Sequence, residues 1–320
     1  MSTLHLVYRS YGGENLKGRP DYYSKALTLA SFVKAASRVP DADVVFLNNG
    51  PIPPRRLALM ERYGRVIEIS EKPVGVQDSY RFSLSLPDRE GWPDDDVVSY
   101  NEDDYLFHPE AFAALAEAAR TLSTVPYFAL SGEHCGYGLP GPIRPADADP
   151  EVARREFGLP RDWKPAPARA VGDGMWFNLP STTATFSARV GTLREDMPIF
   201  RQCMRPFRNR WLDHETCLMY QGFVPYGPRE VVTGLRGDFE PSLRAVARTV
   251  FLIPFRIALN RLARRQTEQH LLYAPVTSLA AHLERPYVGT DQDWPRVAQD
   301  VASWAAQSGF GDVARSSEAS

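Results

Sequence analysis

The sequence has little cysteine and little net charge. Its 320 residues contain three cysteines, Cys135, Cys203 and Cys217, an odd number without the spacing of a metal site. Unpaired thiols of this kind are typical of a reducing compartment and not of a disulfide-stabilised secreted protein. The net charge of -2 and the pI near 6.3 provide no overall basic field, so we do not expect nucleic-acid binding.

Long apolar runs are also missing. No stretch approaches the roughly 20 apolar residues that a helix needs to span a bilayer. The chain passes from Met1 into a strand-like run without a basic segment and an apolar core, so we expect no signal peptide and a cytoplasmic protein. Residues 243–265 mix apolar side chains with arginines and can contact the inner face of a membrane. Because these arginines are not segregated to one face, ordinary packing with exposed arginines is the other interpretation.

Two common phosphate-binding motifs are absent as well. No Gly-x-Gly-x-x-Gly follows the first predicted strand, and no Gly-x-x-x-x-Gly-Lys-Ser/Thr occurs anywhere. A dinucleotide-binding loop and a P-loop are therefore disfavoured. The sequence contains no internal repeat.

What is present is an alternation of strands and helices. The strands are predicted at 4–8, 43–47, 65–69, 97–100, 127–131 and 181–186. The helices are predicted at 22–36, 55–63, 76–86, 109–121, 150–157 and 188–197, from 213, over 243–265 with a break at Pro254, and up to 306. Such alternation predicts an α/β fold of the Rossmann-like type, a mixed but mostly parallel sheet flanked by helices, with a helical C-terminal part.

The chain is predicted to divide into two halves of one domain. The first half spans residues 1–135 and the second spans residues 136–310. The Gly- and Pro-rich region 136–168 is expected to form a long functional loop over the site, because structureless stretches of that length are otherwise unusual. Residues 311–320 are small and polar and are expected to be a disordered tail.

Three acidic residues directly follow a short apolar strand. Residues 97–100 read Val-Val-Ser-Tyr, a run suited to a buried strand, and Glu102, Asp103 and Asp104 come next. Like charges at the end of a buried strand repel one another and lose solvation, so a balancing cation is expected. A Mg²⁺ or Mn²⁺ ion completed by substrate phosphates would provide it. The alternative is a solvated turn that caps the following helix.

Basic and amide side chains follow the first two predicted strands. Open α/β sheets bind ligands at the carboxyl ends of their strands, where these loops and the acidic residues would meet. Arg9, Lys17 and Arg19 are placed to meet a diphosphate there, and Asn48 or Asn49 to contact a base or ribose. Each basic residue taken singly is more simply a surface charge. The prediction therefore depends on their convergence.

A second acidic segment, Asp213-His214-Glu215, stands at the start of a predicted helix. One interpretation is helix capping, and the other is that one carboxylate acts as a general base facing the first site.

With these residues identified, the chain resembles the GT-A type of nucleotide-sugar glycosyltransferase, of the family 2 kind. The resemblance rests on Glu102-Asp103-Asp104-Tyr105 after an apolar strand, which is similar to that family's Asp-x-Asp metal motif, and on the later segment Asp213 to Glu215. It implies transfer of a sugar from a nucleotide diphosphate donor, with UDP-sugars favoured, to an acceptor hydroxyl in glycan or polysaccharide biosynthesis. Residues 1–135 would then bind the nucleotide-sugar, and residues 136–310 would carry the acceptor and catalytic residues. Candidates for contacting a sugar are Asp173, Trp176 and Trp211, although aromatic residues more often belong to a core.

The resemblance also implies particular roles at the donor site. Asp104 would bind the Mn²⁺ or Mg²⁺ ion directly, Glu102 would reach the ribose or a metal-bound water, and Asp103 would occupy the less important middle position. The first-strand loop and Asn48 would hold the nucleoside. The donor-site candidates are Arg9, Tyr11, Lys17, Arg19, Asn48, Asn49, Ser79, Arg81, Glu102 and Asp103.

A late histidine often adds a metal ligand in this family, which implies His282 in preference to His214. A structural histidine is the alternative. The family's usual Glu-Asp catalytic pair is Asp213-His214-Glu215 here, so either carboxylate can be the base that deprotonates the acceptor in an inverting transfer.

Two other classes fit the same residues. A metal-dependent nucleotidyltransferase or phosphohydrolase would also use acidic strand ends, with two metal ions roughly 4 Å apart. A non-catalytic nucleotide- or glycan-binding protein would use Asp213 to Glu215 only as a cap. The sequence leaves open the donor sugar, the acceptor (a glycan, a lipid-linked glycan or a small molecule), inversion or retention, and the oligomeric state.

Overall fold

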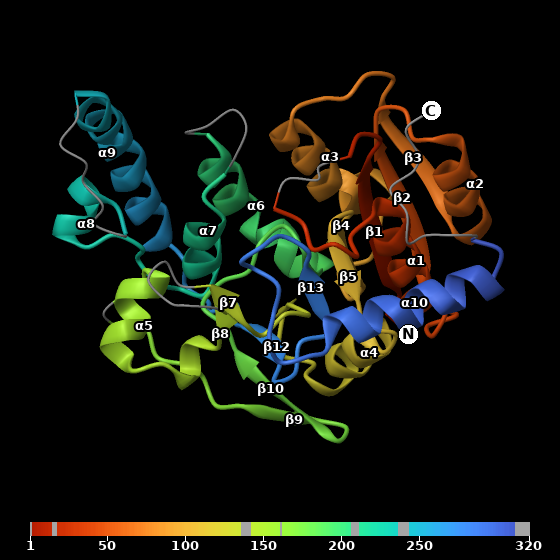
Figure 1. The fold of residues 1–320 in the computed structure, drawn as a ribbon. Helices are drawn as coiled ribbons and strands as arrows, with labels where there is room; N and C mark the ends of the chain where they lie inside the picture. The colour runs from red at the N-terminus through yellow and green to blue at the C-terminus, as the bar shows by residue number, and fades with distance from the viewer. Residues whose placement is uncertain are drawn as a thin grey trace.

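The computed structural model describes residues 2–14, 18–135, 142–160, 162–205, 211–235 and 243–310. Within these ranges the main sheet has nine strands in the order β3-β2-β1-β4-β11-β6-β12-β10-β9 (Figure 1). The strands are β1 (Leu4–Tyr11), β2 (Asp43–Asn49), β3 (Arg65–Ser70), β4 (Val97–Glu102), β6 (Tyr127–Phe128), β9 (Arg169–Val171), β10 (Gly174–Asn178), β11 (Phe186–Arg189) and β12 (Leu272–Pro275).

The sheet is mixed but mostly parallel. Strands β3, β2, β1 and β4 pair in parallel, β11 runs against both β4 and β6, β12 is parallel to β6, and β10 runs against β12 and β9. Only β10 and β11 therefore oppose the direction of the other main-sheet strands described. The predicted α/β class, with helices flanking a mostly parallel sheet, is confirmed. A single sheet joins strands of both predicted halves of the chain.

Helices cover both faces of this sheet. The helices of the described residues are α1 (Lys25–Ala36), α2 (Pro54–Tyr63), α3 (Val76–Arg89), α4 (Ala111–Thr121), α5 (Pro150–Phe157), α6 (Val190–Met204), α7 (Asp213–Tyr220), α8 (Pro228–Thr233), α9 (Leu243–Ala263), α10 (Trp294–Gln307) and the short η1 (Pro145–Asp147). Two smaller pairs complete the fold, β5 (Tyr105–Phe107) with β13 (Ala280–His282) and β7 (His134–Cys135) with β8 (Pro142–Ile143).

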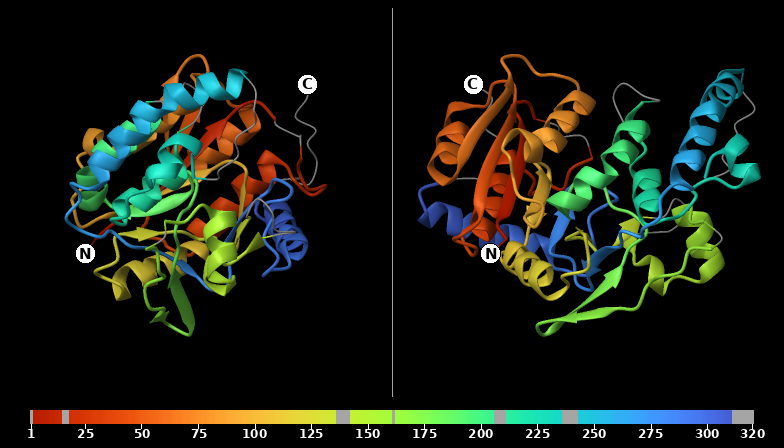
Figure 2. Two further views of the ribbon diagram at one scale, coloured as in Figure 1. Left: turned by 90° about the vertical axis from the view of Figure 1, so that its left-hand side faces the viewer. Right: turned by 180° about the vertical axis from the view of Figure 1, so that it is seen from behind.

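Alternation along β1 assigns the two apolar cores. Leu6 and Tyr8 face α1, α4 and α10, whereas Val7 faces α3, α6 and α7. All three side chains are nearly or fully buried, as expected for a central strand with helices on both faces. Helices α8 and α9 lie at the end of the molecule opposite β3 and α2, as the two views of Figure 2 confirm. No helix in the described ranges combines the length and apolarity needed to cross a membrane.

Two predicted elements are wrong. Residues 181–185 are not a strand, because threonine hydroxyls satisfy the local backbone instead: Thr182 Oγ1 donates to the Thr185 carbonyl at 3.2 Å. Strand β11 begins only at Phe186. Pro254 does not break α9, which runs continuously through it. Pro254 is exposed, so water can bond the carbonyl that lacks its usual donor. The predicted tail at 311–320 lies outside the described residues.

Candidate functional site

The carboxyl ends of β1, β2 and β4 meet at one edge of the sheet. In the parallel register Arg9 lies beside Glu102, Ser10 beside Asn48, and Tyr11 beside Asn49. The predicted convergence of these strand ends is confirmed. The fold brings them together because parallel strands joined by helices present their carboxyl ends on the same side.

Each acidic residue of the triplet has a basic partner. The Arg9 guanidinium donates to Glu102. Lys25 Nζ lies 2.7 Å from Asp103 Oδ2 and 2.8 Å from the carbonyl of Tyr11. The Tyr11 backbone N–H also donates to Asp103 at 2.7 Å. Lys25 is only 4% exposed, and the burial of its ammonium group is tolerated because a carboxylate and a carbonyl both accept hydrogen bonds from it.

Asp104 is held from two directions. Arg19 Nη2 lies 3.0 Å from Asp104 Oδ2, and Arg19 Nη1 donates to the carbonyl of Leu283 at 2.8 Å. His282 Nε2 lies 3.1 Å from the same oxygen of Asp104. His282 pairs with Tyr105 in the β5–β13 ladder, and the two rings stack. The predicted proximity of His282 to Asp104, 178 positions apart in the chain, is confirmed.

These contacts shift the pKa values of the cluster. For Asp104, burial acts to raise the pKa, but His282 and Arg19 outweigh it and lower the pKa to about 2. For His282, burial acts to lower the pKa, but the hydrogen bond and charge of Asp104 outweigh it and raise the pKa. Burial raises the pKa of Glu102 despite the nearby Arg9 guanidinium. The low pKa keeps Asp104 ionised at neutral pH.

The structure provides side-chain cations where the sequence argument invokes a metal ion. Arg9, Lys25 and Arg19 balance the triplet one to one. A cation ligand nevertheless remains, because Asp104 Oδ1 is buried without a hydrogen-bond partner. The carboxylate oxygen suits Mn²⁺ or Mg²⁺, whereas an imidazole such as that of His282 is a more usual ligand for other transition metals, so the residues fit such an ion in part.

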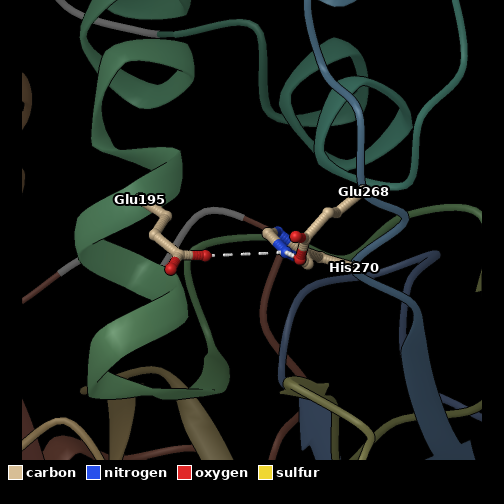
Figure 3. Close-up of side chains that lie close together, drawn as sticks. All are labelled: Glu195, Glu268 and His270. Atoms are coloured by element: carbon tan, nitrogen blue, oxygen red, sulfur yellow. Dashed lines mark ion pairs between the residues drawn. The ribbon is translucent and has the colours of Figure 1, made fainter.

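A tighter group of potential metal ligands lies elsewhere. Among the described residues, Glu195, Glu268 and His270 each offer a ligand atom, and these atoms lie within 4.8 Å of one another (Figure 3). His270 Nδ1 bonds the fully buried Asp196 at 2.8 Å, while Nε2 faces Glu268 at 3.6 Å and Glu195 at 3.8 Å. Asp196 also accepts from Tyr127 on β6 at 2.8 Å. The group ties α6 to the segment before β12, away from the acidic triplet.

The second acidic segment begins α7. Asp213 is the first residue of α7, and the N-cap, Leu212, makes no side-chain cap, so the predicted N-cap role of Asp213 is wrong. Asp213 Oδ1 instead accepts from the neighbouring backbone N–H of His214 at 2.9 Å. Glu215 Oε1 accepts from the hydroxyl of Tyr226 at 2.6 Å. His214 Nε2 lies 3.1 Å from the carbonyl of Gly158, the left-handed residue that ends α5. Gly158, in the region 136–168, thus contacts this segment, and the role of that region as a loop over the site stays a prediction.

Burial raises the pKa of Asp213, and the nearby charge of Glu215 adds to the effect against the opposing hydrogen bond from His214. A carboxylate with a raised pKa is a better proton acceptor at neutral pH than an ordinary exposed one. The bond from His214 uses only one of the two oxygens of Asp213, so the other oxygen can accept a proton.

A chain of contacts connects the acidic triplet to α7. Arg9 donates to Ser79 at 3.3 Å and lies 5.9 Å from the ring centre of Tyr80. Tyr80 stacks on Trp211 at 4.0 Å. Both rings line a narrow cavity together with Asp213 and Thr183.

The same cavity is reached from the other side of the triplet. The Tyr105 hydroxyl, one residue beyond Asp104, lies 2.7 Å from Thr183 Oγ1. The Glu102 backbone N–H donates to Thr185 at 3.3 Å. The cavity, of about 10 Å³, holds no more than a water molecule. The sheet edge that carries the acidic triplet and the Asp213 carboxylate are therefore parts of one region.

The remaining donor-site candidates have mixed placements. Asn48 is 1% exposed, and its Oδ1 is buried without a partner. The side-chain amide of Asn49 accepts from the Val74 backbone N–H at 2.8 Å and donates to the Val74 carbonyl at 3.0 Å. These two bonds fix the loop after β3. Ser79 is buried against Arg9, whereas Arg81 is exposed beside Asp78. Lys17 lies outside the described residues.

The sugar-contact candidates divide clearly. Trp211 lines the cavity, as described above. Trp176 is 2% exposed and packs edge-on against Phe128, so it belongs to the core. Asp173 is exposed in the turn between β9 and β10, where the neighbouring Gly172 approaches Glu117 of α4. The structure does not bring Trp176 and Asp173 to the site that Trp211 joins.

Sequence reasoning missed several residues of the site. Lys25, Tyr80, Thr183 and Tyr226 all contact it, and none belongs to a recognisable motif. A signal existed only for Lys25, which follows the N-cap Ser24 and is a charged residue at an otherwise buried helix start. The other three reach the site through tertiary packing.

Comparison with known proteins shows only distant structural likeness. No protein-family model matches the chain, and no curated protein matches its sequence. The structure of TarS from S. aureus aligns at a TM-score of 0.39 and 11% identity over 95% of this chain and 40% of that chain. Its 1–349 fragment aligns at 0.37 and 12% over 61% of this chain, and the match spans about half, 49%, of the fragment.

Two other solved structures are similar to the same degree. A 4-diphosphocytidyl-2C-methyl-D-erythritol synthase aligns at a TM-score of 0.36 and 10% identity, over 68% of this chain and 84% of that chain. A CMP:2-keto-3-deoxy-manno-octonic acid synthetase complexed with CTP aligns at 0.36 and 14%, over 62% and 78%. At these scores the assignment of an activity depends on the residues of the site itself.

Proposed function

We propose that this protein is a glycosyltransferase that moves a sugar from a nucleoside diphosphate donor, with UDP-sugars favoured, to an acceptor hydroxyl, with inversion at the anomeric carbon. The observation that carries the proposal is the continuous contact from the acidic triplet to α7. Arg9, Tyr80 and Trp211 link Glu102 to the cavity that Asp213 lines. A donor edge and a separate buried carboxylate on one region are what sugar transfer to a hydroxyl requires.

The donor would lie at the carboxyl edge of the sheet. Arg9 and Arg19 are arginines held in place by the triplet, and guanidinium groups bind phosphate oxygens in a bidentate way. Asp104, through its unpartnered Oδ1, and His282 would hold a Mn²⁺ or Mg²⁺ ion, with Glu102 nearby. When bound, such an ion neutralises the charge that develops on the leaving diphosphate.

The acceptor proton would pass to a carboxylate of α7. Asp213 has the raised pKa that favours proton uptake, and Glu215 is oriented by the Tyr226 hydroxyl. We assign the base to Asp213, because it lines the cavity that reaches the triplet, and a positioning role to Glu215. Trp211 would cover one face of the sugar.

The test begins with donor identification. Thermal-shift measurements with UDP-, GDP-, CDP- and dTDP-sugars, each with and without Mn²⁺, should show metal-dependent stabilisation by one nucleotide. Asp213→Asn should then keep donor binding but lower turnover by about 10²–10⁴-fold, the usual contribution of a general base. Asp95→Asn is the matched control, since it removes an exposed carboxylate at the other end of β4.

Two outcomes would contradict the proposal. Full turnover by Asp213→Asn would mean that Asp213 is not the general base. Stabilisation by a nucleoside triphosphate with release of pyrophosphate would instead identify a nucleotidyltransferase, the competing class that uses the same acidic edge.

A further inference from the structure

A large cavity lies beside α7 and has no role in the site so far. It is bounded by α5, α8, α9 and the loop before α8, and its volume is about 1140 Å³. That volume is at or above the upper end of the roughly 300–1,000 Å³ typical of small-molecule sites. It therefore has room for a ligand larger than a single sugar.

Arginines gather on the wall of this cavity. The basic lining residues are Arg154, Arg155, Arg229, Arg261 and Arg264, and the acidic ones are Glu151, Asp162 and Glu230. Arg155 is paired with Glu156. The other four guanidinium groups make no hydrogen bond or ion pair with a described residue. Unpaired arginines converging from three helices favour an anion, and phosphate matches their fork of donors best.

The cavity adjoins the candidate base. Tyr226 lines it and donates its hydroxyl to Glu215 at 2.6 Å. Asn260, also on the wall, fixes the Tyr226 backbone with bonds of 2.6 and 3.1 Å. Leu159 lines the same cavity next to Gly158, whose carbonyl lies 3.1 Å from His214 Nε2. A ligand in the cavity would thus lie on the acceptor side of α7 and not on the donor edge.

Apolar side chains extend from the cavity along α9. Ile257 is on its wall and is 37% exposed, and Phe251 and Val250, further along α9, are 56% and 61% exposed. Exposed apolar side chains next to unpaired arginines suit a ligand that carries both a phosphate and an apolar portion.

We propose that this cavity binds a phosphate or pyrophosphate group of the acceptor. The assignment of this ligand as the acceptor rests on the proposed function, whereas the anion site itself does not depend on it. The phosphate can belong to a soluble sugar phosphate or to a lipid, and the experiment distinguishes these two sources.

The first arm uses inorganic pyrophosphate and isothermal titration calorimetry. Arg9→Ala removes a donor-edge contact, so titrating this variant reports mainly on the cavity. In that background, Arg261→Ala/Arg264→Ala should weaken binding at least about tenfold, because it removes two unpaired charges from the wall. Arg201→Ala/Arg265→Ala is the control: it changes charge equally at exposed arginines outside the cavity, and binding should stay within about twofold.

The second arm uses phosphatidylcholine vesicles with and without phosphatidic acid. Co-sedimentation that requires phosphatidic acid and is lost in Arg261→Ala/Arg264→Ala supports the site with a lipid source. Pyrophosphate binding lost in that variant, without vesicle binding, supports it with a soluble source. Equal binding of both probes by the cavity and control variants overturns the proposal.

The two proposals can fail separately. If the cavity variant loses pyrophosphate binding but the wild-type protein shows no glycosyl transfer, the anion site stands and the proposed function is wrong. If the protein transfers a sugar, and the KM for the acceptor is the same in the cavity and control variants, the proposed function stands and the cavity does not bind the acceptor.

Discussion

The pairing of Lys25 with Asp103 gives the sharpest test of how the acidic edge is stabilised. Lys25 is 4% exposed, and its ammonium group makes bonds of 2.7 Å to Asp103 and 2.8 Å to the Tyr11 carbonyl. Lys25→Met keeps the aliphatic stem and removes the charge. Because an uncompensated charge is then left in a partly buried place, we expect unfolding to become easier by about 3–5 kcal/mol.

The double variant separates the pair from its parts. Asp103→Asn/Lys25→Met removes both charges, so its cost should fall short of the sum of the two single costs by about 2–3 kcal/mol. Urea unfolding measures each value, and with a slope near 3 kcal/mol/M the Lys25→Met midpoint should shift by about 1 M or more. Lys72→Met, at an exposed lysine, is the matched control and should change stability by less than about 0.5 kcal/mol.

Two results would refute this reasoning. Additive costs would mean that Lys25 and Asp103 do not balance each other. Restoration of Lys25→Met to wild-type stability by Mn²⁺, with no such effect on the control, would mean that a metal ion and not Lys25 is the main counter-charge of Asp103.

Three further outcomes follow from the contacts. The hydrogen bond from His5 and then Arg65, against opposing burial, lower the pKa of Asp43 from 3.8 to about 2. Since this folded pKa is depressed, Asp43 contributes about 2 kcal/mol to the free energy of unfolding above pH 4, and this contribution is lost as pH falls toward 2. In that pH range the free energy of unfolding of Asp43→Asn should therefore depend less on pH than that of the wild type. Trp176→Leu should cost about 2–4 kcal/mol in urea unfolding, because the side chain is buried in the core. Trp211→Leu should leave stability within about 1 kcal/mol and instead raise KM several-fold in steady-state assays, since its ring covers the cavity.

The sequence predicted the parts of the fold that local pattern determines. The alternation of strands and helices through residue 121 is observed with end shifts of a few residues, and the helix at 150–157 is observed with the predicted bounds. Failures came where side chains compete locally. At Thr182 and its neighbours the β-branched residues favoured a strand, but their hydroxyls bond nearby backbone, and at Pro254 an exposed position allowed a helix to continue.

The site was predictable where chemistry and topology agree. Parallel strands require Arg9 and Glu102 to lie at one edge, and an acidic triplet requires cations nearby. The identity of those cations was not predictable, because Lys25 reaches Asp103 only through the packing of α1 against β5. The contact of Tyr226 with Glu215 likewise depends on how α9 holds the loop before α8.

The one-to-one pairing at the sheet edge has a thermodynamic consequence for a diphosphate ligand. Arg9 and Arg19 are each engaged with a carboxylate, so a diphosphate must compete with Glu102 and Asp104 for them. A divalent ion taken up by Asp104 would release Arg19 for the phosphate, and the phosphate would in turn offset the ion's charge. Two ligands that each relieve the other's competitor bind cooperatively and with a reciprocal coupling. Stabilisation by a nucleotide and Mn²⁺ together should therefore exceed the sum of their separate effects. If Arg9 and Arg19 were not paired with carboxylates, the two effects would simply add.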